Sequence, residues 1–271
     1  MPRLSVPLTF MKQLDMDIKE NTMTCTSPIL ELAAPALANT LPTGINITSA
    51  ARLEVLITPY SGMDAGDLIE LFWDNCYVGS RQVSQADTHG DITLRIPESF
   101  VVNGTSCIHY RVMRVGRGPA LSAPLRVQIK LDCPGGRPST LIGDENQSLA
   151  PVRIPQAIRR QGVNPNQIKR GVPLTIEPYL NMAAEDAITV RWGDVRMDLP
   201  RIKPCEVGQP IHVWVPPEII TEAGEDLRLE VTYCILDRVG NTSHWAPPRT
   251  LKIGCANANL KSPVQNVVDG R

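Results

Sequence analysis

The sequence predicts an all-β protein built of two antiparallel β-sandwiches in tandem, and three observations support this fold class. Residues 59–73 recur as residues 178–192, 119 positions later, with seven of fifteen positions identical, where unrelated sequences share roughly one. Apolar residues alternate with polar residues in both copies. Twenty-four prolines and nineteen glycines among 271 residues are typical of short strands joined by turns, and this length accommodates two domains.

The alternation has the period of a half-buried strand rather than that of a helix. In the first copy, Ile69, Leu71 and Trp73 alternate with Glu70 and Phe72. Successive side chains of a strand point to opposite faces, so each such segment turns one face toward a core. The same period occurs in three matched pairs of segments, one from each copy: 69–73 with 188–192, 92–96 with 211–215, and 108–112 with 231–235.

The chain divides into five predicted parts. In the first part, Phe10, Leu14 and Ile18 fall at helical spacing, which predicts one short amphipathic helix that is marginal unless it docks on something. The five parts are an N-terminal tail at 1–27, copy one at 28–133, a linker at 134–148, copy two at 149–256 and a C-terminal tail at 257–271.

Further strands and turns complete each copy. About seven short strands in about 105 residues, with a Trp on the third, fit an immunoglobulin-like sandwich. In copy two, Gly240 and Asn241 suit a hairpin at 237–243 before the last strand, whereas copy one has residues 114–118 there, without Asp or Asn. The additional strands are predicted near 29–33, 53–58 and 124–131 in copy one, and near 150–155, 172–177 and 249–253 in copy two.

A shared motif carries a resemblance to a known family. Both copies contain Pro-Tyr-x-x-Met-x-x-x-Asp-x-Ile-x-(Leu/Val)-x-Trp, followed by (Ile/Val)-Pro, a later Tyr and a proline before the final strand. This pattern resembles the tandem immunoglobulin-like repeats of large gammaproteobacterial surface or adhesin-like proteins, and it covers about three quarters of the chain. The resemblance implies a modular interaction fold and supplies no catalytic residues.

The aromatic residues divide into inward and outward groups by parity. Trp73, Trp192, Tyr110 and Tyr233 face inward and are predicted to anchor the two cores.

Four other aromatic residues are the candidates for binding. Phe72 and Trp214 point outward, each where the other copy carries an arginine, so each is a candidate contact with a partner unless the tail, the connector or the other copy covers it. Tyr60 and Tyr179 lie on the loop before the Trp strand, where they either line a binding edge or fold back to close the end of the sandwich.

A calcium site at the start of the Trp strand is conceivable but is not the favoured interpretation. Asp67 and Asp186 precede this strand, and Asp64 lies near the first of them, but copy two has Ala183 at the place of Asp64. Too few acids therefore remain for a calcium site, and we expect the two aspartates to cap turns. We predict no metal and no cofactor.

Seven cysteines cannot all pair within one chain, and none has Cys-x-x-Cys spacing. In an immunoglobulin-like sheet, Cys76 after the Trp strand and Cys107 at the start of the Tyr strand lie on neighbouring strands, so they form a candidate disulfide. Reduced thiols are the default expectation, because the first 25 residues lack the features of a cleavable secretion signal. The compartment is not determined: the cytoplasm is the default, and export without a leader is the alternative.

The connector is basic. Residues 134–170 sum to +4, between −1 for residues 51–133 and −4 for residues 171–256. The connector has no aromatic residue for stacking on bases, so we expect its cations to interact with the acidic second copy rather than with nucleic acid. They are Arg153, Arg159, Arg160, Lys169 and Arg170. No apolar run reaches the length of a membrane-spanning helix.

No pattern in the sequence indicates catalysis. The four histidines lack ligand spacing, and no nucleophile elbow, phosphate loop or His-Glu-x-x-His helix occurs. The sequence therefore predicts a non-enzymatic structural or interaction protein that recognises a protein partner through loops or sheet faces. The alternative is a carbohydrate or small-ligand binding module that uses exposed aromatics as stacking surfaces.

Overall fold

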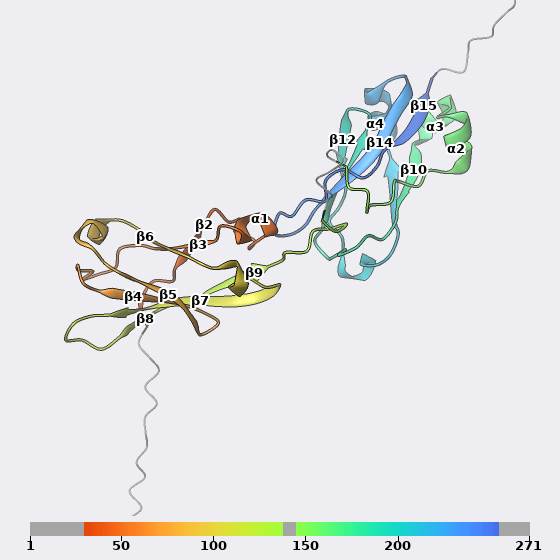
Figure 1. The fold of residues 1–271 in the computed structure, drawn as a ribbon. Coiled ribbons are helices and arrows are strands. Elements are labelled where there is room, and N and C mark those ends of the chain that lie inside the picture. The colour runs from red at the N-terminus through yellow and green to blue at the C-terminus, as the bar shows by residue number, and fades with distance from the viewer. Residues whose placement is uncertain (1–29, 138–144, 255–271) are drawn as a thin grey trace, which may run out of the picture.

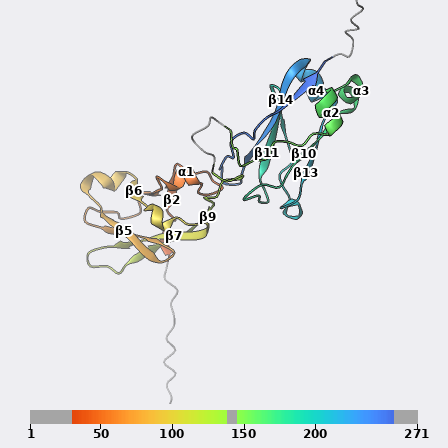
Figure 2. The same cartoon turned by 45° about the vertical axis from the view of Figure 1, so that its right-hand side comes forward.

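The computed structural model describes residues 30–137 and 145–254. Two β-rich bodies, one from each copy of the repeat, lie end to end (Figures 1 and 2). The all-β class predicted from the sequence is confirmed, because strands dominate both bodies and helices are few and short. The predicted helix within residues 1–27 and the C-terminal tail lie outside the described residues.

Copy one is a sandwich of two sheets. One sheet has three antiparallel strands, and the other has six. The first contains β2 (Ala36–Ala38), β3 (Glu54–Ile57) and β6 (Ile92–Arg95), and the second contains β1 (Leu30–Leu32), β8 (Ala120–Ser122), β7 (Gly104–Met113), β4 (Leu68–Trp73), β5 (Cys76–Gln82) and β9 (Leu125–Ile129). Strand β1 runs parallel to β8, and β9 continues the pairing along β7. A four-residue helix, α1 (Ile47–Ala50), lies at the end nearer copy two.

Copy two repeats this plan with a smaller second sheet. Its four-stranded sheet contains β12 (Val195–Asp198), β11 (Ala187–Trp192), β14 (Asp226–Leu236) and β15 (Arg249–Ile253), and its two-stranded sheet contains β10 (Val172–Ile176) and β13 (Ile211–Val215). Three short helices accompany these strands, namely α2 (Gln156–Gln161), α3 (Pro165–Arg170) and α4 (Pro217–Ala223).

The first strand predicted for copy two, at 150–155, is reduced to one bridge between Arg153 and Thr175. Pro151 and Pro155 flank this bridge and have no amide hydrogen to donate to a ladder. The chain then turns into α2 at Gln156.

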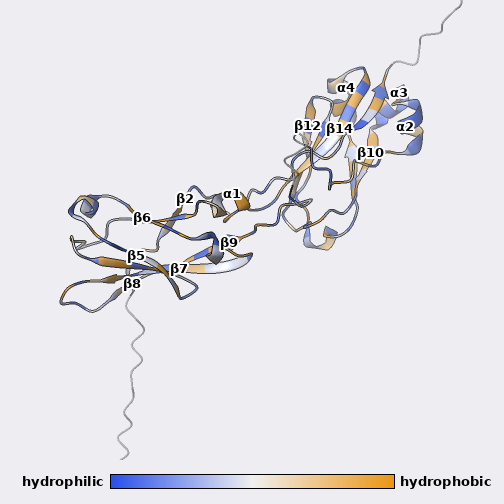
Figure 3. Cartoon of the chain, viewed as in Figure 1, coloured by the Kyte–Doolittle hydropathy of each residue, from blue (hydrophilic) through white to orange (hydrophobic). Residues whose placement is uncertain are grey.

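The alternation read from the sequence places the core. In β4 and β11, alternate residues are buried, and both strands end on a tryptophan. Trp73 and Tyr110 are 2% exposed, while Trp192 and Tyr233 are fully buried. Each copy has a separate hydrophobic core, with buried members running from Leu32 to Ile129 in copy one and from Leu149 to Ile253 in copy two. Figure 3 shows apolar and polar residues interspersed along the strands of both bodies.

Candidate binding surfaces

The outer face of β4, β5 and β7 in copy one carries a cluster of aromatic rings and one arginine. Phe72 is half-buried and lies opposite His109 in the register of the two strands. The two rings stack with centroids 5.1 Å apart at an angle of 7°, and Tyr77 meets Phe72 edge-on at 6.1 Å. The Arg111 guanidinium lies 5.3 Å from the Phe72 centroid and pairs with Glu70 at 2.7 Å. We call Phe72, Tyr77, His109 and Arg111 the aromatic face.

The aromatic face is partly buried, and its edge is exposed to solvent. Burial, aided by the charge of Arg111, lowers the pKa of His109, so a neutral imidazole stacks on Phe72 at neutral pH. Tyr77 is 54% exposed. The rings are already packed against one another, which reduces the side-chain entropy that a partner would have to remove.

Copy two has a corresponding cluster built from other positions. Arg191 occupies the place that Phe72 has in copy one, and its guanidinium lies 4.9 Å from the Trp245 centroid, while Arg196 lies 5.7 Å from the same ring. The sequence did not single out Trp245 as a candidate. The signal that could have found it is the arginine at the place of Phe72, because a guanidinium is attracted to the face of an aromatic ring.

Trp214 is 56% exposed on the outer face of β13. Its indole lies against the backbone of Gly171, where a Cβ atom would overlap the indole Nε1. Glycine at 171 therefore leaves room for the ring, which is held on one side and open on the other.

Tyr60 and Tyr179 lie in the same arrangement in the two copies. The Tyr60 hydroxyl donates to Asp67 at 3.0 Å, and the Tyr179 hydroxyl donates to Asp186 at 2.9 Å. Asp186 also accepts from the backbone amide of Ala183 at 2.9 Å, so it caps the turn before β11. The two phenols thus close one end of each sandwich instead of standing free in solvent.

Burial shifts the ionisation of this turn. It raises the pKa of Tyr60 and of Tyr179, with further contributions from their partner carboxylates. Burial also raises the pKa of Asp186. Within residues 30–137 and 145–254, no group of three or more His, Cys, Asp or Glu side chains is placed to hold a metal ion.

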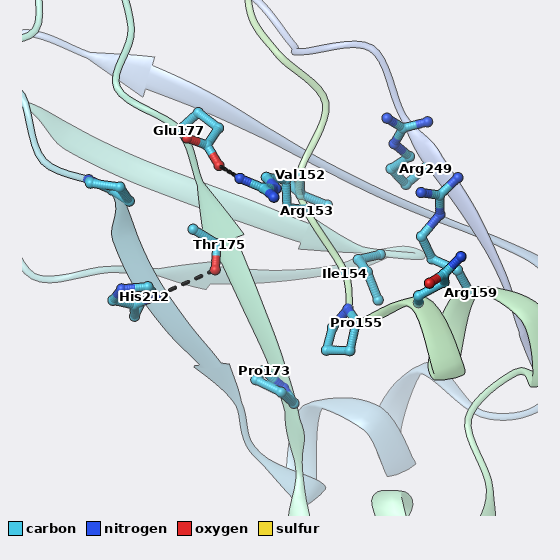
Figure 4. A pocket seen from close by; sticks show the side chains of 12 residues that line it. Val152, Arg153, Ile154, Pro155, Arg159, Pro173, Thr175, Glu177, His212 and Arg249 are labelled. Carbon is cyan, nitrogen blue, oxygen red and sulfur yellow. Dashed lines mark hydrogen bonds and ion pairs between the residues drawn. The ribbon is translucent and has the colours of Figure 1, made fainter.

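A cleft of about 580 Å³ opens on copy two between the segment before α2, strands β10 and β13, and the start of β15 (Figure 4). Arg153 pairs with Glu177 across it at 2.6 Å, and Thr175 contacts His212 at 3.3 Å. Three prolines give the cleft rigid apolar walls, namely Pro155, Pro173 and Pro210. Arg159 and Arg249 also line the cleft, and neither has an ion-pair partner in the part of the chain that the structure describes.

The remaining predicted sites are placed as follows. Cys76 is exposed and Cys107 is half-buried, and both are free thiols in the structure, so the candidate disulfide is not formed there. Among the basic residues of the connector, Arg153 pairs with the acidic Glu177 of copy two, the body in which it itself lies. Arg160, Lys169 and Arg170 are exposed and make no ion pair with any described residue. None of the described helices is long and apolar enough to cross a membrane.

The chain is similar in structure to several solved proteins at low sequence identity, whereas no protein-family model and no curated protein matches it. A 1.5-MDa bacterial ice-binding adhesin is 12% identical over 84% of this chain and 65% of that chain, with a TM-score of 0.37. A biofilm-associated protein domain is 12% identical over 81% and 29%, with a TM-score of 0.24. Fibronectin(III)-like modules of Clostridium thermocellum CbhA are 9% identical over 84% and 96%, with a TM-score of 0.42.

The chain thus spans just under two thirds of the adhesin structure's length and less than one third of the biofilm protein's length. Likeness at these scores carries no argument about function, and the all-β class rests on the strands described above.

Proposed function

We propose that this protein is a non-enzymatic interaction module that recognises a partner protein through the aromatic face of copy one. The carrying observation is the cluster of Phe72, His109, Tyr77 and Arg111 on an open sheet face. Aromatic and arginine side chains are enriched at the centres of protein interfaces, where they supply most of the binding energy. The buried core beneath β4 holds the cluster in place.

A photo-crosslinking residue at position 77 tests this proposal in the full chain. We expect it to capture a defined partner in cells, and the purified partner to lose affinity about tenfold or more when Phe72 is changed to Ala. The matched control places the same probe at position 227, because Leu227 is 68% exposed on copy two. Equal capture at the two positions, or unchanged affinity of Phe72→Ala, would contradict the proposal.

A second candidate function is supported by the cleft of copy two. Two guanidiniums without ion-pair partners among the described residues face rigid proline walls, and guanidinium geometry suits carboxylate or sulfate oxygens. The candidate is a small-ligand or carbohydrate module for acidic sugars, and the exposed Trp214 ring is a separate stacking surface for neutral sugars.

A glycan array distinguishes these functions. Binding of uronate or sulfated glycans that is lost in Arg159→Ala and Arg249→Ala supports the cleft. The control is Arg160→Ala, which removes the same charge from the next residue of α2 but does not line the cleft. Hits that depend on Trp214 assign binding to the indole instead, and an array without hits leaves the protein-partner proposal as the surviving function.

A further inference from the structure

The loop between β14 and β15 lies at the junction of the two copies and is closed by one aspartate. Asp237 accepts hydrogen bonds from the backbone amides of Val239 and Asn241 at 3.0 and 2.8 Å, and from the Asn241 side chain at 2.8 Å. Asp237 and Asn241 are both 3% exposed. The loop therefore has one defined shape where copy one meets it.

The Asn241 side chain forms hydrogen bonds with two separate backbone segments of copy one. Its Oδ1 accepts from the amide of Ile47, at the start of α1, at 3.0 Å. Its Nδ2 donates to the carbonyl of Lys130, just after β9, at 2.8 Å. Val239 is fully buried beside this contact, and a Cβ atom on Gly240 would lie 2.5 Å from Leu41 of copy one.

The Lys130 side chain reaches into copy two and lies between two buried carboxylates. Its Nζ is 3.2 Å from Asp237 Oδ2 and 3.7 Å from Asp186 Oδ1. Asp186 is fully buried, and its Oδ1 accepts no hydrogen bond from any described residue. Lys130 is therefore the cation that neutralises this oxygen. We call Asp186, Asp237 and Asn241 the acceptor end of copy two.

In copy one, the aspartate before the Trp strand is neutralised by an arginine of the same copy. The position that corresponds to Asp237 is Arg114, whose Nε lies 3.5 Å from Asp67. Arg114 also donates to the Ser61 carbonyl at 3.2 Å, and its guanidinium lies 5.1 Å from the Tyr60 centroid. Val115, the residue after Arg114, is 97% exposed, whereas Val239 in the loop of copy two is fully buried in the junction.

The donor side differs between the copies as well. When the final strands are aligned on Pro124 and Pro248, Lys130 corresponds to Gly254, which carries no charge. Copy one therefore holds the donor lysine without the acidic acceptor, and copy two holds the acceptor without the lysine.

We infer that the two copies couple in one order only: copy two takes the counter-ion of its buried Asp186 from Lys130 of copy one, whereas copy one carries its own counter-ion in Arg114. This inference is independent of the proposed binding face. A buried carboxylate that loses its cation is strongly destabilised, so copy two depends on copy one, and the reverse dependence is absent.

Hydrogen exchange measured by mass spectrometry on the full chain tests this inference, because peptides from the two copies are read separately. We expect Lys130→Met to lower protection in β11 and β14 by about tenfold or more while β4 and β7 keep theirs. Arg114→Met reverses the pattern. Lys252→Met removes an exposed lysine of copy two and serves as the control.

A double variant keeps the test decisive where the single variant fails to fold. Asp186→Asn combined with Lys130→Met removes the charges of both residues, while the amide oxygen at 186 still accepts from Tyr179 and Ala183. We expect protection in copy two to recover in part, because Asp237, 3.2 Å from Lys130 Nζ, still loses its cation. Equal losses in the two copies, a loss no larger than that of Lys252→Met, or no recovery in the double variant would each overturn the inference.

Discussion

The same tyrosine–aspartate hydrogen bond occurs in both copies, but a different cation lies beside the aspartate in each. Tyr60 and Tyr179 make the same hydrogen bond to an aspartate, yet the cation beside that aspartate comes from Arg114 in copy one and from Lys130 of the other copy in copy two. The seven identities among the fifteen aligned residues therefore say less about the end of each sandwich than the one position where Arg114 stands in place of Asp237.

The half-buried phenols make stability fall at alkaline pH. Burial raises the pKa of Tyr179 above its ordinary value of 10.0, so its contribution is fully present below pH 10 and is lost as the pH rises through the folded-state pKa. Each such phenol contributes a slope of about 1.4 kcal/mol per pH unit in that window. We expect melting temperatures of Tyr179→Phe to fall less steeply than those of the unaltered protein between pH 10 and 11. Tyr77→Phe, at an exposed position, should leave the slope unchanged.

Thiol reactivity should follow burial. Cys76 and Cys205 are exposed, whereas Cys133 is buried and burial raises its pKa. Because the thiolate is the reactive form, we expect alkylation of the native protein at pH 8 to label Cys76 and Cys205 first and Cys133 last among the five cysteines that the structure describes, as peptide mass mapping would show. Resistance of Cys76 and Cys107 until a reductant is added would reveal the bridge that the structure lacks.

At the scale of elements, the alternation of apolar and polar residues predicts the strands, and the turn residues predict where the strands end. The period of two in residues 69–73 places Trp73 inward because a strand's neighbours point to opposite faces. The same rule predicts Phe72 outward but cannot say that His109 stacks on it, since strand register is set by pairing across the sheet.

The short helices cannot be predicted from the periodicity of apolar residues. Helix α3 has six residues, fewer than two turns, so no helical period can be recognised in it. Its local signals are nevertheless present: Asn164 accepts from the Gln167 amide at 2.9 Å and Pro165 occupies the first turn. The junction could be anticipated only in part, because the sequence shows that 114–118 and 237–243 differ but not that Lys130 lies between the carboxylates.

The hairpin of copy two should be more sensitive to substitution than its counterpart in copy one. Gly240 has φ +89° and a Cβ there would meet Leu41, while Gly116 has φ +74° and open space around it. Both alanine variants incur the cost of a left-handed backbone, about 1 to 2 kcal/mol. The Leu41 contact is with the end of a flexible side chain that is 50% exposed and can turn away. We therefore expect Gly240→Ala to lower the free energy of unfolding beyond Gly116→Ala by less than about 1 kcal/mol, as measured by urea denaturation.

At the scale of the whole molecule, two cores are joined by a few buried polar contacts. Asn241 bonds to two backbone groups of copy one, and Lys130 enters the acceptor end of copy two. These contacts fix one relative placement of the copies, as seen in the end-to-end arrangement of Figure 1. We expect this junction to hold the aromatic face and the cleft at a constant separation.

Removing the two hydrogen bonds from the Asn241 side chain to copy one should let the two copies move relative to each other. Asn241→Ala leaves the Ile47 amide and the Lys130 carbonyl without their partner, which we expect to cost about 1 to 3 kcal/mol. Small-angle X-ray scattering should then show a broader distribution of distances. Thr242→Ala, at the exposed neighbouring position, should keep the profile of the unaltered protein, and identical curves for the two variants would argue against a fixed junction.

The self-neutralised end of copy one has a consequence during synthesis on the ribosome. Copy one emerges first, and its Lys130 is then a bare cation until copy two is complete. The matching end of another nascent chain offers no free carboxylate to that cation, because Asp67 is already paired with Arg114 at 3.5 Å. We therefore expect incomplete chains not to associate end to end into filaments. An Arg114→Asp protein is expected to aggregate during translation.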